Sequence, residues 1–498
     1  MVMKTKLLFL FTFASLIILG QHEMSSFTST GRGGATSFVT DYQAIGINPA
    51  NLGWPSKHEG LNYALGLSEF SYSLHSQVLT KQELRDAFSS IYKKDSSNNF
   101  TYDEKIATAQ EFANSGMAMD VDLGTFGFAF NNDKFGGIGF RINDQINWYS
   151  KFNQTTSEIL FLGKLAPYFD SLVYIDPTTL DTTLIQNYQG ISEDSAQHVA
   201  SGFSNSQNPI SEIIDGSHIS FSWLREYNLS YGRQIFKIED KLNVYAGIGF
   251  KYLHGFGYVD VKSEDNVLSA FSSLSPIFPI DYGGADTLNP STVTQPDGSF
   301  FPKPVGSGFG MDLGLSFLIE NKIKVGMALT NVGSMKWSGN VYTINDTTIY
   351  DTESAGLENY SIFQQLGDVA GDDGLFEWQG LEEKKVKLPS TFRIGASFKI
   401  KEAAELGVDI IIPTNDGMGN LNKAIIGVGG DVYPFDWLRI SAGFITGGNY
   451  DVQIPLGLTF IAGGGSWEGG IASRDAITFF VQNGPTLSLS TGFMRFRF

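Results

Sequence analysis

The side chains best suited to acid–base or metal chemistry in this sequence are its histidines, and they are widely dispersed. The six are His22, His58, His75, His198, His218 and His254. None belongs to an H-E-x-x-H motif, which places two zinc ligands and a general base on one helix face. The chain also has no cysteine, which excludes thiolate metal sites, a cysteine nucleophile and disulfides. We therefore expect no metal site and no cofactor.

Hydrolytic chemistry has little basis in the sequence. There is no G-x-S-x-G nucleophile elbow, and a hydrolase of another kind would need His75 or His218 beside a serine or a carboxylate. Asp368, Asp372 and Asp373 could bind Ca²⁺ weakly, but a hydrated acidic loop explains them more simply. We expect no catalytic residues, and we do not expect an enzyme.

A second group of candidate residues is charged and recurs within apolar stretches. Its members are Arg141, Lys251, Asp312, Arg393, Asp409, Asp431 and Arg439. In these stretches one alternating face is Val, Ile, Leu, Phe or Met, and the other is mostly Gly, Ser and Thr. Arginines on the small-residue face could bind a solute carboxylate in bidentate geometry. They could also pair with the aspartates, and the similar number of both signs favours that pairing.

The elements that must position these charges are β-strands. Leu242, Val244, Ala246 and Ile248 alternate with small or polar residues without a break, which is the pattern of a strand with one apolar face. The pattern predicts about 14 strands, at 61–74, 117–130, 135–150, 218–233, 242–252, 308–317, 323–329, 392–398, 405–412, 423–433, 437–446, 451–461, 466–480 and 485–498. In the first, a switch of parity near Glu69 predicts a β-bulge.

The connections alternate in length. Short turns, such as 131–134 and 319–322, alternate with the longer segments 80–115, 151–217, 261–305 and 339–387. In the first of these, Thr80 and Glu83 form a capping box before one helix, and a second helix fits 103–113. In the second, a small hairpin fits 158–162. Long loops at one end and short turns at the other are typical of outer-membrane barrels, and a soluble sandwich has no reason for this asymmetry.

Composition and the N-terminus agree with a membrane barrel. Lys4 and Lys6 precede the apolar run 7–19, which predicts a cleaved secretory signal peptide over 1–20. No later stretch has the length and apolarity of a spanning helix, so the mature chain could enter lipid only as a closed barrel. The formal charge of -18 excludes nucleic acid as a partner, because phosphate binding needs a basic surface.

The last strand illustrates the expected polarity. In the sequence from Thr486 to Phe498, one alternating face carries Gly492, Met494, Phe496 and Phe498. The other carries Thr491, Phe493, Arg495 and Arg497. An apolar face toward lipid and a cationic face toward a lumen predict an all-β fold: a transmembrane antiparallel β-barrel over 61–498. The ending Met494, Phe496 and Phe498 resembles the signal that outer-membrane barrels present to the barrel assembly machinery.

Residues 21–60 differ from the rest, because Gly, Pro and small polar residues dominate and alternation is poor. A barrel of this size encloses more space than its own side chains fill, so this segment is expected to form an N-terminal plug in the lumen. Here the sequence resembles the FadL type, outer-membrane transporters of long-chain fatty acids and other hydrophobic compounds. The residues that match its plug motif are Gly33, Gly34, Ala35, Asp41, Asn48, Pro49 and Ala50.

The resemblance extends through the second half, in G-S-G-F-G-M-D-L-G-L at 306–315 and L-P-S-T-F-R-I-G at 388–395. It is nearest to an uncharacterised Bacteroidota branch related to the type IX secretion shuttle proteins. It implies a location in the Gram-negative outer membrane, in contact with its lipid, and passage of a hydrophobic ligand past the plug. A kink at Gly136, Gly137 and Gly139 would then offer a lateral exit. The alternative is a scaffold or shuttle that does not transport and binds a secreted protein through its outer loops.

Overall fold

The computed structural model describes most of the chain. The described residues are 26–34, 37–55, 60–76, 78, 100–188, 191–206, 208–239, 241–278, 280, 282–295, 301–358, 376–401, 403–417, 419, 423–448, 450–476 and 486–498. Several predicted features lie outside them. These are the signal peptide over 1–20, Ala35, the helix that follows Thr80, and the acidic group Asp368, Asp372 and Asp373.

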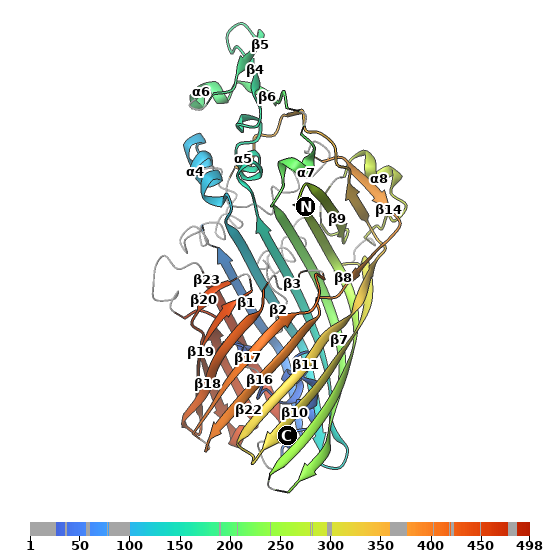
Figure 1. Cartoon of the computed structure of the whole chain (residues 1–498), viewed down its shortest axis with the longest axis vertical. Coiled ribbons are helices and arrows are strands. Elements are labelled where there is room, and N and C mark those ends of the chain that lie inside the picture. Colours follow the sequence, from blue (N-terminus) through green and yellow to red (C-terminus); the bar gives the residue numbers. More distant parts are fainter. Residues whose placement is uncertain are drawn as a thin grey trace, which may run out of the picture.

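The described chain forms a closed antiparallel barrel of 14 strands, which confirms the predicted fold class (Figure 1). They are β1 (Tyr63–Ser76), β2 (Gly116–Asn132), β3 (Gly136–Lys151), β7 (His218–Ile238), β8 (Leu242–Glu264), β10 (Gly306–Ile319), β11 (Ile323–Trp337), β16 (Thr391–Ile400), β17 (Ala404–Pro413), β18 (Ile425–Phe435), β19 (Leu438–Gly447), β21 (Leu456–Ala462), β22 (Trp467–Ser473) and β23 (Thr486–Arg497). Each pairs with the next, and β23 pairs with β1 from Ala64↔Arg497 to His75↔Thr486. We call this closing pair the seam.

Short turns join the strands at one end of the barrel, which we call the turn end. Between β10 and β11, Glu320 and Asn321 both adopt positive φ, +48° and +54°. Two successive residues of this kind match the right-handed twist of the flanking strands. Both ends of the described barrel chain also lie here, because the Tyr63 amide donates to the Phe498 carbonyl at 2.9 Å. The opposite end, where the long connections lie, is the loop end.

The wall has the expected polarity. Large apolar side chains such as Leu229, Phe250, Val428 and Phe444 are exposed on the outside of the strands, as contact with lipid requires. At the turn end, Tyr63 stacks on Phe498 with ring centroids 5.6 Å apart, part of an aromatic rim. No helix among the described residues is long and apolar enough to cross a bilayer.

Two local features concern side-chain direction. Ser68 adopts φ +52°, and the buried positions of β1 change parity beside it, which confirms the bulge predicted near Glu69.

The faces predicted for the last strand need correction at one point. Gly492 is directed into the lumen, whereas Phe493 and Met494 are both exposed outside. The β22–β23 register shifts between Glu468 and Gly470, and this irregularity reverses the alternation.

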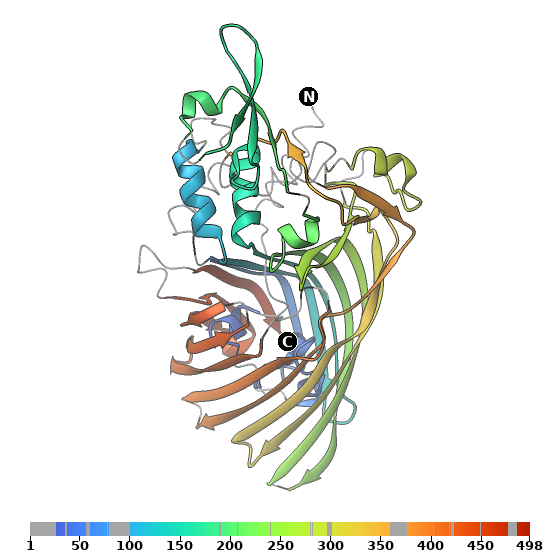
Figure 2. The same cartoon turned by 45° about the horizontal axis from the view of Figure 1, so that its top comes forward.

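The loop end carries structure of its own. Its elements are α4 (Tyr102–Phe112), α5 (Gln154–Leu162), η4 (Gly163–Leu165), β4 (Ser171–Ile175), β5 (Thr182–Gln186), α6 (Glu193–Ala196), β6 (Val199–Phe203), α7 (Ile210–Ile213), β9 (Val267–Leu274), α8 (Gly284–Leu288), β12 (Val341–Ile344), β13 (Asp351–Thr352), β14 (Trp378–Leu381), β15 (Lys384–Lys387) and β20 (Tyr450–Gln453), whereas η5 (Gly463–Gly465) forms the turn between β21 and β22 at the turn end. Strands β13, β6, β4 and β5 form a separate sheet. These elements stand above one side of the barrel (Figure 2).

Three expectations in this part were wrong. The hairpin predicted at 158–162 is helix α5, which Asn153 caps by accepting from the Thr156 amide at 2.7 Å. Strand β8 continues past Tyr252 to Glu264 and forms a hairpin with β9. The strand predicted over 451–461 is divided into β20 and β21 around Pro455, because proline has no N–H to donate to a ladder.

Helices α4 and α5 pack against the ends of the first strands. Thr101 and Glu104 form a capping box that begins α4. Phe112 of α4 and Phe161 of α5 contact each other at 5.1 Å between ring centroids. Both belong to one buried cluster with Met119 of β2 and Trp148 of β3. The helices therefore bury apolar wall residues that lipid would otherwise have to cover.

Candidate functional site

The lumen at the turn end is filled by residues 26–34 and 37–55, which we call the plug. It contains three short elements, α2 (Phe27–Thr30), η1 (Asp41–Ala44) and η2 (Pro49–Gly53). Ser26 caps α2, and Asn48 caps η2 through the Ala50 amide at 3.1 Å. Phe27, Phe38 and Tyr42 are almost completely buried. Because the plug has no strand among its described residues, it is attached to the wall through side chains and close packing.

Glycines on the inner wall make room for the plug. A Cβ atom added to Gly247 would lie 2.3 Å from the Ala50 nitrogen, and one on Gly137 would lie 1.9 Å from the Leu52 oxygen. Gly66 and Gly127 face the Tyr42 ring, and Gly492 faces Phe27, in the same way. The plug therefore occupies the space beside these five inward glycines.

The plug residue Asp41 binds the last strand. Its carboxylate lies 2.7 Å from Arg495 and 3.1 Å from Arg497. Glu468 of β22 binds the same two arginines at 2.8 and 2.9 Å. The four side chains are buried or nearly so, and each charge has at least two partners of opposite sign. This arrangement offsets part of the desolvation cost of buried charges.

The residues that follow Asp41 bind the first strand. The Tyr42 hydroxyl donates to Glu69 Oε1 at 2.6 Å, and Gln43 Nε2 donates to the same oxygen at 2.8 Å. Asp41, Tyr42 and Gln43 therefore hold both strands of the seam from inside the lumen.

The arginine and glycines at the start of the plug bind the other side of the wall. Arg32 forms an ion pair with Asp431 at 2.7 Å, and Arg439 lies 4.0 Å from the same carboxylate. Arg393 donates to Asp409 at 3.2 Å and to the Gly34 carbonyl at 3.3 Å. Gly33 and Gly34 adopt φ +68° and +71°, a conformation that favours glycine.

The Asn-Pro-Ala motif lies at the bottom of the lumen. Asn48 Nδ2 donates to the Leu315 carbonyl at 3.2 Å and to the Met327 carbonyl at 3.4 Å. Pro49 and Ala50 pack against Gly247 of β8. The predicted plug residues that are described, Gly33, Gly34, Asp41, Asn48, Pro49 and Ala50, thus all contact the barrel wall or shape the plug backbone.

The seven predicted lumen charges are all buried, and six of them have a charged partner. Four of them form the two pairs already described, Asp431 with Arg439 and Arg393 with Asp409. Lys251 lies 3.4 Å from Asp312 and 3.4 Å from Glu226. The partners are on neighbouring strands rather than across the lumen. Arg141 differs, because it has no ion pair or hydrogen bond among the described residues.

The structure does not have the predicted kink in β3. Gly136, Gly137 and Gly139 pair without interruption with β2, and the last two also pair with β7. Gly137 and Gly139 lie against Leu52 and Ile45 of the plug, and Gly136 lies against Gly232 and Arg233 of β7. Gly137 and Gly139 thus provide space for the plug, and no lateral opening follows from the three glycines.

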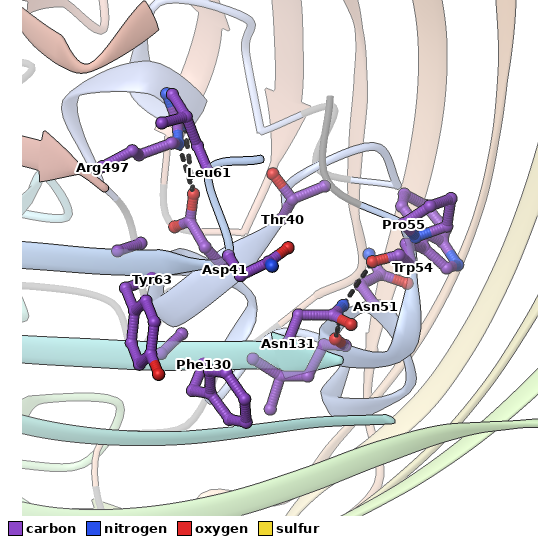
Figure 3. A pocket seen from close by; sticks show the side chains of 14 residues that line it. Thr40, Asp41, Asn51, Trp54, Pro55, Leu61, Tyr63, Phe130, Asn131 and Arg497 are labelled. Atoms are coloured by element: carbon purple, nitrogen blue, oxygen red, sulfur yellow. Dashed lines mark hydrogen bonds and ion pairs between the residues drawn. The ribbon is translucent and has the colours of Figure 1, made fainter. Parts of the chain in front are cut away.

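A small cavity of about 50 Å³ remains between the plug and the wall at the turn end (Figure 3). Asp41 and Arg497 lie on one side of it, and Asn131 lies on the other. Asn131 Nδ2 donates to the carbonyl of Leu52 at 2.6 Å and also to that of Trp54. A second cavity of about 20 Å³ lies toward the loop end, between Ser29 and Arg474. Both have room for a few waters at most.

Above the plug, toward the loop end, the inner wall becomes polar and then apolar. Lys251 belongs to the polar level, and Leu253 follows on the same face of β8. With Met335, Trp337 and Leu388 it forms part of a buried apolar cluster. A Cβ on Gly306 would lie 2.7 Å from the Trp337 ring, which places that ring on the inner face. We call this cluster the apolar layer.

The histidines form no catalytic arrangement among the described residues. His75 Nδ1 lies 3.0 Å from Thr486 Oγ1, and His218 Nε2 lies 2.8 Å from Asp260 Oδ1. No described serine donates to His218. No group of three or more possible metal ligands is found in the described part of the chain.

Sequence reasoning missed several residues that hold the plug. Arg32, Tyr42, Gln43, Glu69 and Glu468 were not predicted as site residues. Glu69 and Glu468 are carboxylates within strands whose outer faces are apolar, and that pattern could have marked them. No comparable signal distinguishes Arg32 or Gln43 in the sequence.

Solved structures with a similar shape are outer-membrane proteins. TodX, the toluene transporter of Pseudomonas putida, has a TM-score of 0.42 at 9% identity, over 97% of this chain and 99% of that chain. A FadL homologue of Pseudomonas aeruginosa has 0.39 at 10% identity, over 96% and 100%. The translocator domain of NalP from Neisseria meningitidis has 0.29 at 7%, over 89% and 90%. Scores and identities this low carry no argument about function.

The sequence comparisons give one family. No curated protein matches the chain. A family model described as "Family of unknown function (DUF5723)" matches residues 178–463, from the outer sheet to the end of β21. That range is more than half of the chain. The chain therefore belongs to the DUF5723 family.

Proposed function

We propose that this chain is a gated channel of the Gram-negative outer membrane that lets small hydrophobic molecules pass its plug. The observation that carries the proposal is the way the plug is held. Ion pairs, hydrogen bonds and packing against wall glycines hold the plug in the lumen, and no described plug residue forms a β-ladder with a strand of the wall. Such a segment can rearrange without breaking the barrel ladder.

The class of solute is supported by the apolar layer. Leu253, Met335 and Trp337 lie inside the barrel toward the loop end, where a molecule from outside would first meet the lumen. Apolar side chains there favour hydrophobic compounds. The FadL resemblance implies the same class, while the Bacteroidota branch and the type IX relationship stay predictions.

Location and assembly belong to the same proposal. The outward apolar side chains of the wall support contact with outer-membrane lipid. Met494, Phe496 and Phe498 are exposed on the outside of the last strand, which is compatible with recognition by the barrel assembly machinery. The signal peptide and its cleavage stay predictions.

The proposal can be tested by locking the plug. A Cβ on Gly31 would lie 3.2 Å from the Ser441 Cβ and 2.9 Å from the Gly457 Cα, so the plug must shift slightly, and that shift brings the two Cβ atoms toward the separation of about 3.5–4.5 Å that a disulfide needs. Because the chain has no cysteine, Gly31→Cys with Ser441→Cys can form only this bond within the chain. In proteoliposomes we expect passage of a labelled fatty acid or of toluene to stop on oxidation and to resume on reduction.

The single-cysteine variants are the controls, and they should pass solute under both conditions. Equal passage by the oxidised and reduced double variant would contradict plug gating. Absence of passage for every hydrophobic probe by the unmodified protein would contradict transport itself.

A scaffold function has one observation in its favour. The hairpin of β4 and β5 projects from the loop end, and its Leu180, Leu184 and Tyr188 are exposed. Exposed apolar side chains of this kind can mark an interaction surface. A photo-crosslinker at Leu184 in intact cells should give a protein adduct in stoichiometric yield if the chain is a scaffold, whereas a channel should give none.

A further inference from the structure

We propose that Glu69 is a switch residue, which exchanges its plug partners for Arg141 when the plug leaves its seat. The inference rests on the proposed plug movement and identifies the wall residues that stabilise the open state. The seated state, with Tyr42 and Gln43 bound to Glu69, is the one that the structure contains.

In the seated state Glu69 is only half satisfied. Its Oε1 accepts from both Tyr42 and Gln43, while Oε2 is buried and has no hydrogen-bond partner. Both donors are neutral side chains of the plug. If the plug moved away, a buried carboxylate would lose both partners, and an unpaired buried charge is strongly unfavourable.

Arg141 is the corresponding unused cation. Its side chain is 2% exposed, its Nη1 has no partner, and the described residues provide it with no carboxylate. Buried arginines are normally paired. The absence of a partner in the seated state is explained if the partner is occupied elsewhere in that state.

The two side chains meet across a glycine. Gly124 of β2 pairs with Glu69 on one side and with Asn143 on the other. A Cβ on Gly124 would lie 3.3 Å from Arg141 Nη2 and 3.4 Å from the Glu69 Cβ. No side chain therefore separates them, and a change of Glu69 rotamer can bring its carboxylate to the guanidinium.

Other charges near Glu69 are already occupied. Arg495 is the second cation close to Glu69, but it binds Asp41 and Glu468 at 2.7 and 2.8 Å. Arg141 is therefore the uncommitted cation within reach. A charge-assisted pair with Arg141 replaces two neutral hydrogen bonds, so the exchange offsets the loss of the plug contacts.

The exchange is tested by the rate at which the plug becomes accessible. Ser37 is a buried plug residue whose hydroxyl has no partner, so Ser37→Cys supplies a single reporter thiol at little cost. Its rate of labelling by a water-soluble maleimide measures the population of the open state. In the purified detergent-solubilised protein, Arg141→Gln should slow labelling roughly tenfold or more, because it removes a hydrogen-bonded charge pair from the open state.

Two variants provide the controls. Arg141→Lys keeps the charge and should restore much of the wild-type rate. Arg393→Gln removes a lumen arginine that holds the plug directly through the Gly34 carbonyl, so it should accelerate labelling. Heat-modifiable migration on gels confirms that each variant is a closed barrel.

Faster labelling of Arg141→Gln would mean that Arg141 only supports the seated structure, and an unchanged rate would mean that no exchange occurs. Either result overturns the inference. Gly124→Ala is an independent test, because its methyl group would separate the two side chains and should also slow labelling. None of these assays requires a solute, so they can succeed or fail independently of transport.

Discussion

Asp41 of the plug lies 2.7 Å from Arg495 of the last strand, although 454 residues separate them in the sequence. The next two plug residues bind Glu69 of the first strand. One short segment of the plug therefore contacts both strands whose pairing closes the barrel. The plug is an inner support of the seam as well as an obstruction of the lumen.

Removing the carboxylate at this point should weaken the seam. In Asp41→Ala, Arg495 and Arg497 lose one of their two partners, and breaking a buried ion pair costs about 3–5 kcal/mol. We expect the folded barrel to convert to the unfolded gel band at a lower temperature than the wild type.

An exposed ion pair provides the matched control. Lys336 and Glu383 form an ion pair at the loop end with both side chains about half exposed, and such pairs contribute about 0–1 kcal/mol. Lys336→Ala should leave the conversion temperature nearly unchanged. If Asp41→Ala behaved like Lys336→Ala, the contact of Asp41 with Arg495 and Arg497 would not stabilise the seam.

Glycines that face the plug should be intolerant of alanine. In Gly247→Ala the new methyl group would meet the backbone of Pro49 and Ala50 at 2.3 Å, so the plug must shift. We expect the Ser37→Cys reporter to be labelled faster in this background. Gly116→Ala is the comparison, because its Cβ would meet only the Tyr149 ring at 3.9 Å. Equal rates for the two variants would show that the plug does not lie against this wall.

The outward face of the wall should reject charge. Leu229 is exposed near the middle of β7, and an arginine facing the bilayer midplane costs about 2–4 kcal/mol. Leu229→Arg should lower folding yield and stability in lipid vesicles. Leu288 is also exposed but lies on α8 at the loop end, so Leu288→Arg should be tolerated. A similar loss in both variants would argue against a lipid-facing wall at Leu229.

The helices at the loop end should be separable from the barrel. Phe112 is buried between α4, α5 and the wall, and Phe→Ala at such a position costs about 3–5 kcal/mol. We expect Phe112→Ala to increase hydrogen exchange in α4 and α5 while β10 and β11 keep their protection. The neighbouring Glu111→Ala, at an exposed position, should change neither. Loss of protection throughout the barrel would show that the helices are part of one cooperative unit.

Much of this architecture follows from sequence periodicity. Strand β10 and the first part of β8, from Leu242 to Tyr252, alternate in sequence, because lipid on one side and a lumen on the other impose opposite polarity on neighbouring residues. Lys251, Asp312 and Asp431, which the same rule places on the small-residue face, are buried in the structure. A turn is also present at the predicted position 319–322, where Glu320 and Asn321 both have positive φ.

What could not be predicted depends on contacts between distant segments. The reversal at Phe493 and Met494 results from a register shift between β22 and β23, which the alternation of one strand does not contain. The glycines of β3 predicted a kink, because a sequence cannot tell a flexible glycine from one against which another backbone packs. Arg141 resembles the paired lumen charges in sequence, and only the surrounding residues distinguish it.

The most direct test of the central claim is an experimental density map of the full chain in a lipid nanodisc. We expect the lipid belt to surround the strands at Leu229, Val428 and Phe444, with density for residues 26–55 inside the barrel at the turn end. The Asp41–Arg495 contact should be visible in that density. An empty lumen, or apolar wall residues packed between two sheets instead of against lipid, would contradict the account.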